Sequence, residues 1–388
     1  MNTLSIAVWI ATSLLTPADP QGPTRAPRFA RGLPEDSRSF PIGVWLQAPR
    51  NAARYKELGI NLYVGLWKGP TAEQLDALDA AEMPVICEQN EFALTQLERP
   101  TIVGWMHADE PDNAQALPDD KGWGPPIAPA KVVEHFQRMR SADPTRPVLL
   151  NLGQGVAWDG WHGRGSRSGH PEDYLEYVRG CDIACFDIYP VAHDKPAVAG
   201  KLEFVGRGVE RLRGWCPPEQ RVFACIETTQ VGGAGRCATP AELRSEVWMA
   251  LIHGARGIVY FVHEFKPKFV EAGLLANPEM SRAVRELNAE VARFAPLLDA
   301  HDARDAVTVE SSPRDVRIAL LCRREAAGLM IFAVAMGAAR TAATFEVRSA
   351  DRAPKVEVLG EERRLELRNG RFADTFEGYA VHIYRIQR

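Results

Sequence analysis

Several features that would point to common protein classes are missing from this sequence. The longest N-terminal apolar run, Leu4–Leu15, has about a dozen residues, well short of the roughly 20 that a membrane-spanning helix needs. No integral membrane span is therefore expected. Forty-six Lys and Arg against 50 Asp and Glu give a formal net charge of -4, with no basic block, which argues against nucleic acid as a partner.

Cysteine motifs and nucleotide-binding motifs are also missing. The seven cysteines are odd in number and contain no Cys-x-x-Cys spacing, so neither a disulfide framework nor a zinc or redox motif is indicated. No Gly-x-Gly-x-x-Gly follows an early strand candidate, which leaves a dinucleotide crevice without support. We therefore predict no cofactor and no metal.

The N-terminal apolar run has the length of a signal-peptide core, and Thr16-Pro17-Ala18 follows it as a loose match to a cleavage site. We predict a signal peptide over residues 1–18 and an exported protein, periplasmic or extracellular. Residues 19–38 are rich in Pro and Arg and lack apolar periodicity, which is typical of a linker or an extended arm.

Between residues 39 and 298, short apolar runs alternate with amphipathic helical stretches, a pattern that favours βα units around a parallel sheet. Eight of these units in about 255 residues predict a (β/α)8 barrel. The strand candidates are Phe40–Leu46, Asn61–Leu66, Pro84–Glu88, Thr101–Ala108, Pro147–Leu152, Asp182–Tyr189, Arg221–Thr228 and Gly257–Val262.

Residues 299–388 show a different pattern, with alternating runs and no long amphipathic helix. This predicts a small antiparallel β-sandwich after the barrel. The runs are Val307–Glu310, Val316–Cys322, Leu329–Ala335, Ala342–Val347, Val356–Leu359, Leu365–Leu367 and Ala380–Tyr384.

The active site of such a barrel lies at the C-terminal ends of its strands. Strand candidate four ends in Asp109-Glu110-Pro111, and strand candidate seven ends in Ile226-Glu227-Thr228. A carboxylic acid and a carboxylate facing each other across a barrel mouth are the pair that cleavage of a glycosidic bond requires.

The placement of these two residues resembles the retaining glycoside hydrolases of clan A, and the resemblance covers the barrel. It implies that Glu110 is the acid/base and Glu227 the nucleophile in a double displacement on a β-linked glycoside. The family also has a Tyr near the end of strand six that hydrogen-bonds the nucleophile, and Tyr189 in Asp187-Ile188-Tyr189-Pro190 matches it.

The sequence also departs from that family in three places. Asp109 replaces the Asn that usually precedes the acid/base, and an ionised Asp accepts hydrogen bonds but cannot donate them as Asn does. The family's Arg near the end of strand two and Trp at the end of strand eight are absent from Gly65-Leu66-Trp67 and Tyr260-Phe261-Val262-His263. No subfamily is assigned.

Sugar contacts are predicted among aromatic and polar side chains that follow the strands, because flat aromatic faces suit the C–H faces of sugars. The aromatic candidates are Trp45, Trp67, Trp123, Trp158 and Trp161. The polar candidates are Asp109, Gln89, Asn151 and His263. The predicted partner is accordingly a carbohydrate substrate.

Two other readings stay open. A metal-dependent hydrolase would use ligands from His107, Asp109, Glu110, Asp187, His193 and His263, although the sequence lacks His-x-His on strand one and a His-Glu-x-x-His helix. A carbohydrate-binding barrel without catalytic activity is the second alternative, favoured by Asp109 and by the missing strand-eight Trp. The leading hypothesis is a retaining glycosidase.

Overall fold

The computed structural model describes residues 28–34, 39–232, 236–298, 300, 303–325, 328–348 and 355–387. The predicted signal peptide lies outside the described residues, as does most of the predicted linker. Within the described part of the chain, no helix combines the length and the apolar character that crossing a bilayer demands.

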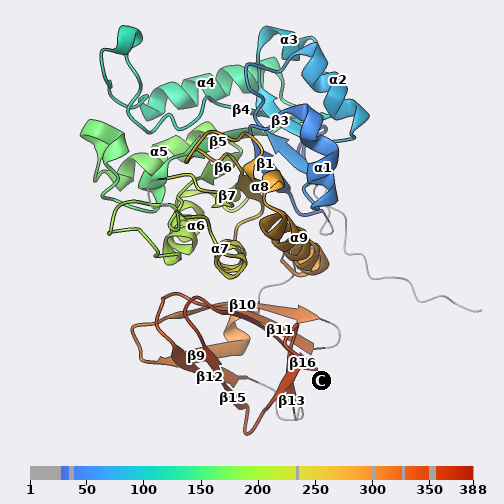
Figure 1. Cartoon of the computed structure of the whole chain (residues 1–388), viewed down its shortest axis with the longest axis vertical. Helices are drawn as coiled ribbons and strands as arrows, with labels where there is room; N and C mark the ends of the chain where they lie inside the picture. Colours follow the sequence, from blue (N-terminus) through green and yellow to red (C-terminus); the bar gives the residue numbers. More distant parts are fainter. Residues whose placement is uncertain are drawn as a thin grey trace, which may run out of the picture.

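The predicted barrel is confirmed: eight parallel strands close into a ring in chain order, with β1 hydrogen-bonded to both β2 and β8 (Figure 1). Each observed strand falls within one of the predicted ranges. The strands are β1 (Ile42–Trp45), β2 (Leu62–Val64), β3 (Val85–Glu88), β4 (Ile102–Met106), β5 (Val148–Leu152), β6 (Ile183–Phe186), β7 (Arg221–Glu227) and β8 (Ile258–Phe261).

Burial on both faces explains why these strands are nearly continuous apolar runs. In β6, Ile183 and Cys185 point into the barrel interior, whereas Ala184 and Phe186 join the larger core between strands and helices. Because successive side chains alternate between the two faces, residues 187 and 189 beyond the strand point to the inside at the barrel mouth.

Helices surround the ring (Figure 1). Two of them begin with a capping box, formed by Thr71 and Gln74 in one helix and by Thr239 and Glu242 in the other. The sequence around each start therefore determines where the helix begins. The α-helices are α1 (Ala52–Glu57), α2 (Ala72–Ala80), α3 (Glu91–Leu94), α4 (Pro129–Ala142), α5 (Tyr174–Tyr177), α6 (Glu203–Trp215), α7 (Pro240–Ile252), α8 (Gly273–Ala276) and α9 (Pro278–Leu298).

The predicted C-terminal sandwich is also confirmed, as a five-stranded sheet in the order β10-β11-β16-β13-β14 and a three-stranded sheet in the order β15-β12-β9. The strands are β9 (Val307–Ser312), β10 (Ile318–Glu325), β11 (Gly328–Ala335), β12 (Thr341–Val347), β13 (Lys355–Val358), β14 (Arg363–Glu366), β15 (Arg371–Phe376) and β16 (Val381–Gln387). Sequence reasoning missed β15, because Asp374 interrupts the apolar alternation of Phe372 and Phe376 and pairs with Arg363 instead.

The sandwich packs against the barrel through α7. The Trp248 ring stacks on Phe332 of β11 with centroids 5.1 Å apart, and Ser245 Oγ donates to the Tyr379 carbonyl oxygen at 2.7 Å. Arg244 adds a hydrogen bond to the Val381 carbonyl oxygen at 3.0 Å. This contact lies on the flank of the barrel and leaves the mouth open.

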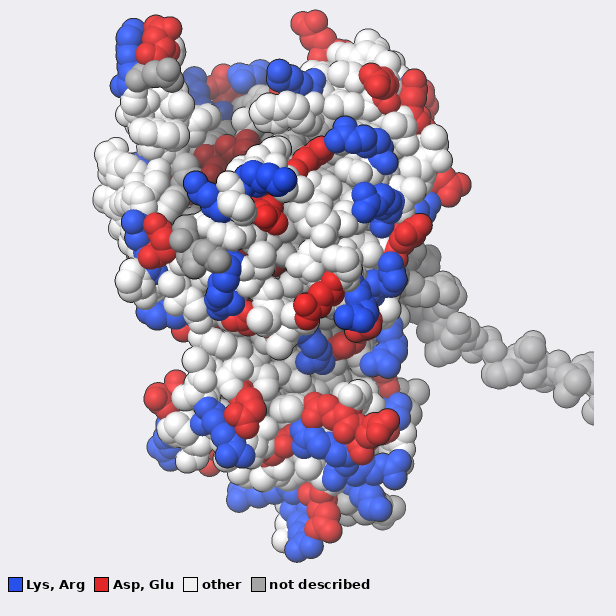
Figure 2. Space-filling model, viewed as in Figure 1, with Lys and Arg blue, Asp and Glu red and all other residues white. Residues whose placement is uncertain are grey.

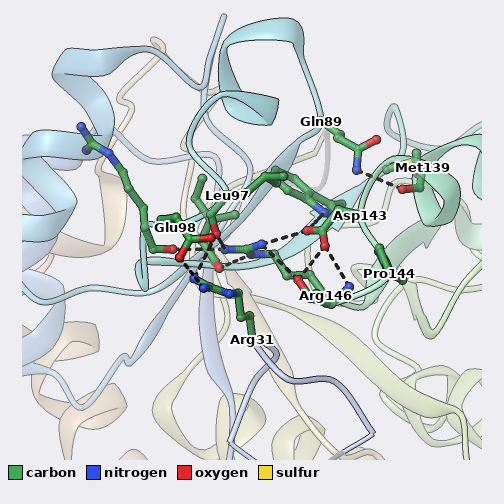
Figure 3. A network of polar contacts seen from close by, with 12 residues as sticks. Arg31, Gln89, Leu97, Glu98, Met139, Asp143, Pro144 and Arg146 are labelled. Carbon is green, nitrogen blue, oxygen red and sulfur yellow. Dashed lines mark hydrogen bonds and ion pairs between the residues drawn. The ribbon is translucent and has the colours of Figure 1, made fainter.

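Residues 28–34 close the opposite end of the barrel. The Arg31 amide donates to the Thr145 carbonyl oxygen, its guanidinium contacts Leu97 and Glu98, and Leu33 is buried in the interior cluster. Figure 3 shows this floor, where the fully buried Arg146 pairs with Asp143 at 2.8 Å. The side chains of Arg31 and Arg146 are hydrogen-bonded at this end, which is in keeping with the stabilising role of the floor in such barrels.

Candidate active site

Two carboxyl groups meet at the barrel mouth, one from the loop after β4 and one from the end of β6. The side chains of Glu110 and Asp187 hydrogen-bond each other. Tyr189 points to the same side as Asp187 and directs its hydroxyl at Asp187 Oδ2 from 3.5 Å. The structure therefore brings Glu110 and Tyr189 to one carboxyl group, that of Asp187, which was not among the predicted catalytic residues.

This pair holds a proton more tightly than isolated carboxyls would. Burial, and then the charges of Asp109 and Asp112, raise the pKa of Glu110 to about 7. Burial and the neighbouring Glu110 raise the pKa of Asp187 well above its usual range. The hydrogen bond between the two groups raises the pKa of Asp187 and lowers that of Glu110, so in the unliganded pair the shared proton lies on Asp187.

The loop after β4 holds Glu110 in a defined position. Its backbone φ is +43°, in the left-handed region that non-glycine residues rarely adopt, and Asn113 Nδ2 donates to Glu110 Oε2 at 2.8 Å. Asn113 is itself fixed, because Trp161 Nε1 donates to Asn113 Oδ1 at 2.8 Å. Strained, over-determined backbone of this kind is typical of functional sites.

The fully buried Asp112 ties this loop to β5 and α5. Its carboxylate accepts from the Gly153 amide at 2.9 Å and from the Tyr174 hydroxyl at 2.7 Å. Gly153 follows β5 and lies against the acid: a β-carbon on it would approach Glu110 Oε1 to 2.8 Å. Glycine is needed there for space and not for backbone conformation, since its φ is -80°.

Gly153→Ala is expected to displace the Glu110 carboxyl and to lower kcat/KM by about 10²-fold, the usual effect of misplacing a reacting group by about 1 Å. The measurement is kcat/KM on a substrate that the parent protein turns over, together with the thermal unfolding midpoint. Gly214→Ala on α6 is the matched control, because no atom lies within 4 Å of the added β-carbon. Equal activity of the two variants would contradict this role of Gly153.

The structure places Glu227 elsewhere in the site region. It is fully buried, and its two oxygens accept the backbone amides of Val191 and Ala192, at 2.6 and 2.8 Å, from the loop after β6. Its neighbouring acid is Glu246 on α7, not Glu110 or Asp187. Glu227 thus anchors the loop between β6 and α6, and both of its oxygens are engaged.

The Tyr189 hydroxyl likewise differs from the sequence expectation. The resemblance implied a hydrogen bond from this hydroxyl to a nucleophile at Glu227, but the acceptor within reach is Asp187. The physical reason is strand parity, because side chains two residues apart point to the same face.

Glu227 and Glu246 form a second buried acid pair, and among the described residues Glu246 makes no hydrogen bond outside it. Burial raises the pKa of Glu227 to about 7 and that of Glu246 well above its usual value. The folded state therefore binds more protons than the unfolded state. The stability that this pair contributes is present below the unfolded pKa of 4.5 and is lost as the pH rises through about 7.

Glu246→Gln is expected to reduce this loss, because a neutral amide donates to the Glu227 carboxylate at every pH. Between about pH 5.5 and pH 8, the fall in unfolding free energy should shrink by about 1–3 kcal/mol relative to the parent protein. Urea unfolding at both pH values measures it. Glu279→Gln, at an exposed position on α9, is the control, and an equal effect of both substitutions would contradict the assignment.

A cleft of about 1070 Å³ opens beside the carboxyl pair at the ends of β1, β2 and β8. Four of the predicted contact residues, Trp45, Trp67, Asp109 and His263, line it. Figure 2 shows the hollow in this face of the barrel, with acidic side chains deep inside it. Trp67 is 68% exposed, whereas Trp45 is buried and forms part of the wall.

The other predicted contacts divide into two groups. Asn151 lies in the mouth and donates to Asp109 Oδ1 at 2.9 Å. Trp158 lies behind the β4 loop, with its ring centroid 6.1 Å from that of Trp161, so both support the wall that positions Asn113.

Gln89 and Trp123 lie outside the cleft lining. Gln89 donates to the Met139 carbonyl oxygen of α4 at 3.1 Å, as Figure 3 shows. Trp123 is 74% exposed on the long loop that precedes α4.

Sequence reasoning missed Asp187 as a partner of Glu110, and it missed Asn113 and Gly153 as supports. The sequence position of Asp187 could have revealed its role. Asp187 stands two residues before Tyr189, so the two side chains are expected to point to the same inner face. Asn113 and Gly153 had no such signal, because their roles depend on how two loops meet. Among the described residues, no group of three or more His, Cys, Asp or Glu side chains is placed to hold a metal ion.

Fold and site together define a (β/α)8 barrel with a proton-sharing carboxyl pair at its mouth. No protein-family model and no curated protein sequence matches this chain. Its fold is similar to that of a noncanonic maltogenic alpha-amylase AmyB from Thermotoga neapolitana, at a TM-score of 0.51 and 9% identity, over 91% of this chain and 99% of that one. It is also similar to the fold of the alpha-amylase from Geobacillus thermoleovorans, complexed with acarbose, at a TM-score of 0.53 and 10% identity, over 92% of this chain and 100% of that one.

Proposed function

We propose that this protein is a glycoside hydrolase in which Glu110 is the acid/base and Asp187 the nucleophile. The observation that carries the proposal is the hydrogen-bonded pair of carboxyls at the barrel mouth, with the pKa of Glu110 raised to about 7. The amylases that share the fold are glycoside hydrolases, which supports the same reaction class.

The reaction proceeds in two displacements. A sugar that enters between the two carboxyls breaks their hydrogen bond, and the shared proton passes from Asp187 to Glu110. The Asp187 carboxylate then attacks the anomeric carbon while Glu110 gives this proton to the glycosidic oxygen, so the C–O bond breaks and the aglycone leaves as an alcohol or phenol. Glu110, now ionised, then takes a proton from water, whose oxygen attacks the anomeric carbon and releases Asp187. Tyr189 donates to Asp187 and stabilises its negative charge before attack.

The closeness of the pair favours retention of configuration over inversion. Inverting enzymes hold their carboxyls about 6.5–9.5 Å apart to admit a water, whereas retaining enzymes hold them about 5–5.5 Å apart. Carboxyls close enough to hydrogen-bond lie nearer to the retaining spacing than to the inverting one, and a sugar entering between them replaces their mutual hydrogen bond.

A panel of para-nitrophenyl α- and β-glycosides tests the proposal, with proton NMR identifying the anomer released first. Turnover with retained configuration is expected, and the strand-four resemblance implies that the substrate is β-linked. Absence of turnover across the panel by folded protein would contradict the glycosidase, while first release of the inverted anomer would contradict a nucleophile.

A further inference from the structure

Most of the polar side chains that line the cleft beside the carboxyl pair are already bonded to other groups of the protein. Gln47 bonds His263, the Tyr55 hydroxyl and the Glu271 carbonyl oxygen. The Glu271 carboxylate accepts from the Ala48 amide at 2.8 Å and from Arg50 at 2.6 Å. These polar side chains are thus committed to one another and to the backbone.

The same holds on the β2 side of the cleft. Gln74 accepts from the Thr71 amide and donates to the Trp67 carbonyl oxygen at 2.9 Å. Among the charged side chains of the described lining, Lys68 and Glu73 lack a hydrogen bond or ion pair, and the indole N–H groups of Trp45 and Trp67 are also free donors. A second sugar ring needs several directed hydrogen bonds, so this wall fits a sugar poorly.

Apolar faces, by contrast, are abundant and open. Trp67, Phe265 and Phe269 are 68%, 45% and 60% exposed, and they are three of the six large hydrophobic side chains exposed in the described part of the chain. Half of the exposed large hydrophobic side chains therefore lie in one cleft. A concentration of this kind marks a binding site for an apolar group.

A ladder of rings joins this cleft to the reacting groups. Tyr189, whose hydroxyl contacts Asp187, lies 5.1 Å from Phe261 between ring centroids. Phe261 stacks on Phe265 at 6.2 Å, and Phe265 lies 5.6 Å from Phe269. A ligand group that extends from the carboxyl pair along these rings meets aromatic surface over its whole length.

We infer that this cleft binds the leaving portion of the substrate and that this portion is an aromatic, apolar aglycone rather than a second sugar. The inference rests on the proposed function for the reaction itself. The aromatic cleft would lower KM for glycosides of extended phenols, because their rings stack between Trp67 and the Phe265–Phe269 wall and leave the bonded polar groups undisturbed.

The kinetic test compares phenyl and naphthyl glycosides of the same sugar, since the two phenols have similar acidity and differ mainly in ring area. The naphthyl glycoside is expected to show a KM about tenfold lower, and the double variant Trp67→Ala/Phe269→Ala to abolish this difference. Leu175→Ala, an exposed apolar side chain on α5 outside the cleft, is the matched control. Equal KM for both glycosides in the parent protein would overturn the inference.

Calorimetry with free naphthol tests the cleft without any turnover. Binding to the parent protein and to Leu175→Ala, but not to the double variant, is the expected result. If naphthol binds in this way while no glycoside is hydrolysed, the result supports the aromatic binding site and contradicts the proposed glycosidase activity. Binding of a linear oligosaccharide that the double variant loses, with no naphthol binding, would overturn the aromatic aglycone and leave the glycosidase intact.

Discussion

Replacing Glu110 by glutamine is expected to lower kcat/KM for glycosides with poor leaving groups by about 10²–10⁴-fold, the usual contribution of a general acid. Glutamine keeps the size of the side chain and the hydrogen bond from Asn113 through its carbonyl oxygen, but it carries no proton to transfer. The leaving oxygen then departs without protonation, so the cost falls on bond cleavage. Steady-state kinetics on alkyl or phenyl glycosides measures the loss.

Two further readouts separate this role from a structural one. Dinitrophenyl glycosides leave without a proton, so the loss in Glu110→Gln should be much smaller with them. The parent protein should lose activity as the pH rises above about 7, where Glu110 gives up its proton, and Glu110→Gln should lack this alkaline limb. A loss equal for all leaving groups, with the alkaline limb kept, would contradict Glu110 as the acid.

The fold was predictable because its signals are local and repeated. Each barrel strand is an apolar run between amphipathic stretches, and starts such as Thr71 and Thr239 carry their own caps. The exception, β15, shows the limit of such signals: Asp374 on its inner side is stabilised by Arg363 of β14, a partner that no local pattern announces.

The site was predictable only in part, for a related reason. Glu110 follows a strand at the mouth of the barrel, so its place came from the fold alone. Glu227 also ends a strand, yet the loop after β6 supplies two amides that bind its carboxylate, and the sequence does not encode this contact in any local pattern. The sequence predicts well which residues lie at the barrel mouth. It predicts less well the direction in which their carboxyl groups point, because that depends on contacts between loops.

Replacing Asp187 by asparagine is expected to lower kcat/KM by at least about 10⁴-fold, the scale seen when a nucleophile is removed. The amide cannot attack the anomeric carbon, and no covalent intermediate forms. Asp187 lowers the pKa of Glu110 through their hydrogen bond, and an asparagine amide can donate the same hydrogen bond, so the alkaline decline of any residual activity should stay near pH 7.

Azide distinguishes the two candidate nucleophiles. In Asp187→Gly the freed space admits azide, which attacks the anomeric carbon of an activated aryl glycoside and yields the glycosyl azide of inverted configuration. Turnover should therefore recover with azide in Asp187→Gly and stay unchanged in Glu227→Gly, whose lost carboxylate had anchored a loop. Rescue of Glu227→Gly alone would restore Glu227 as the nucleophile and reduce Asp187 to a neighbour that tunes the acid.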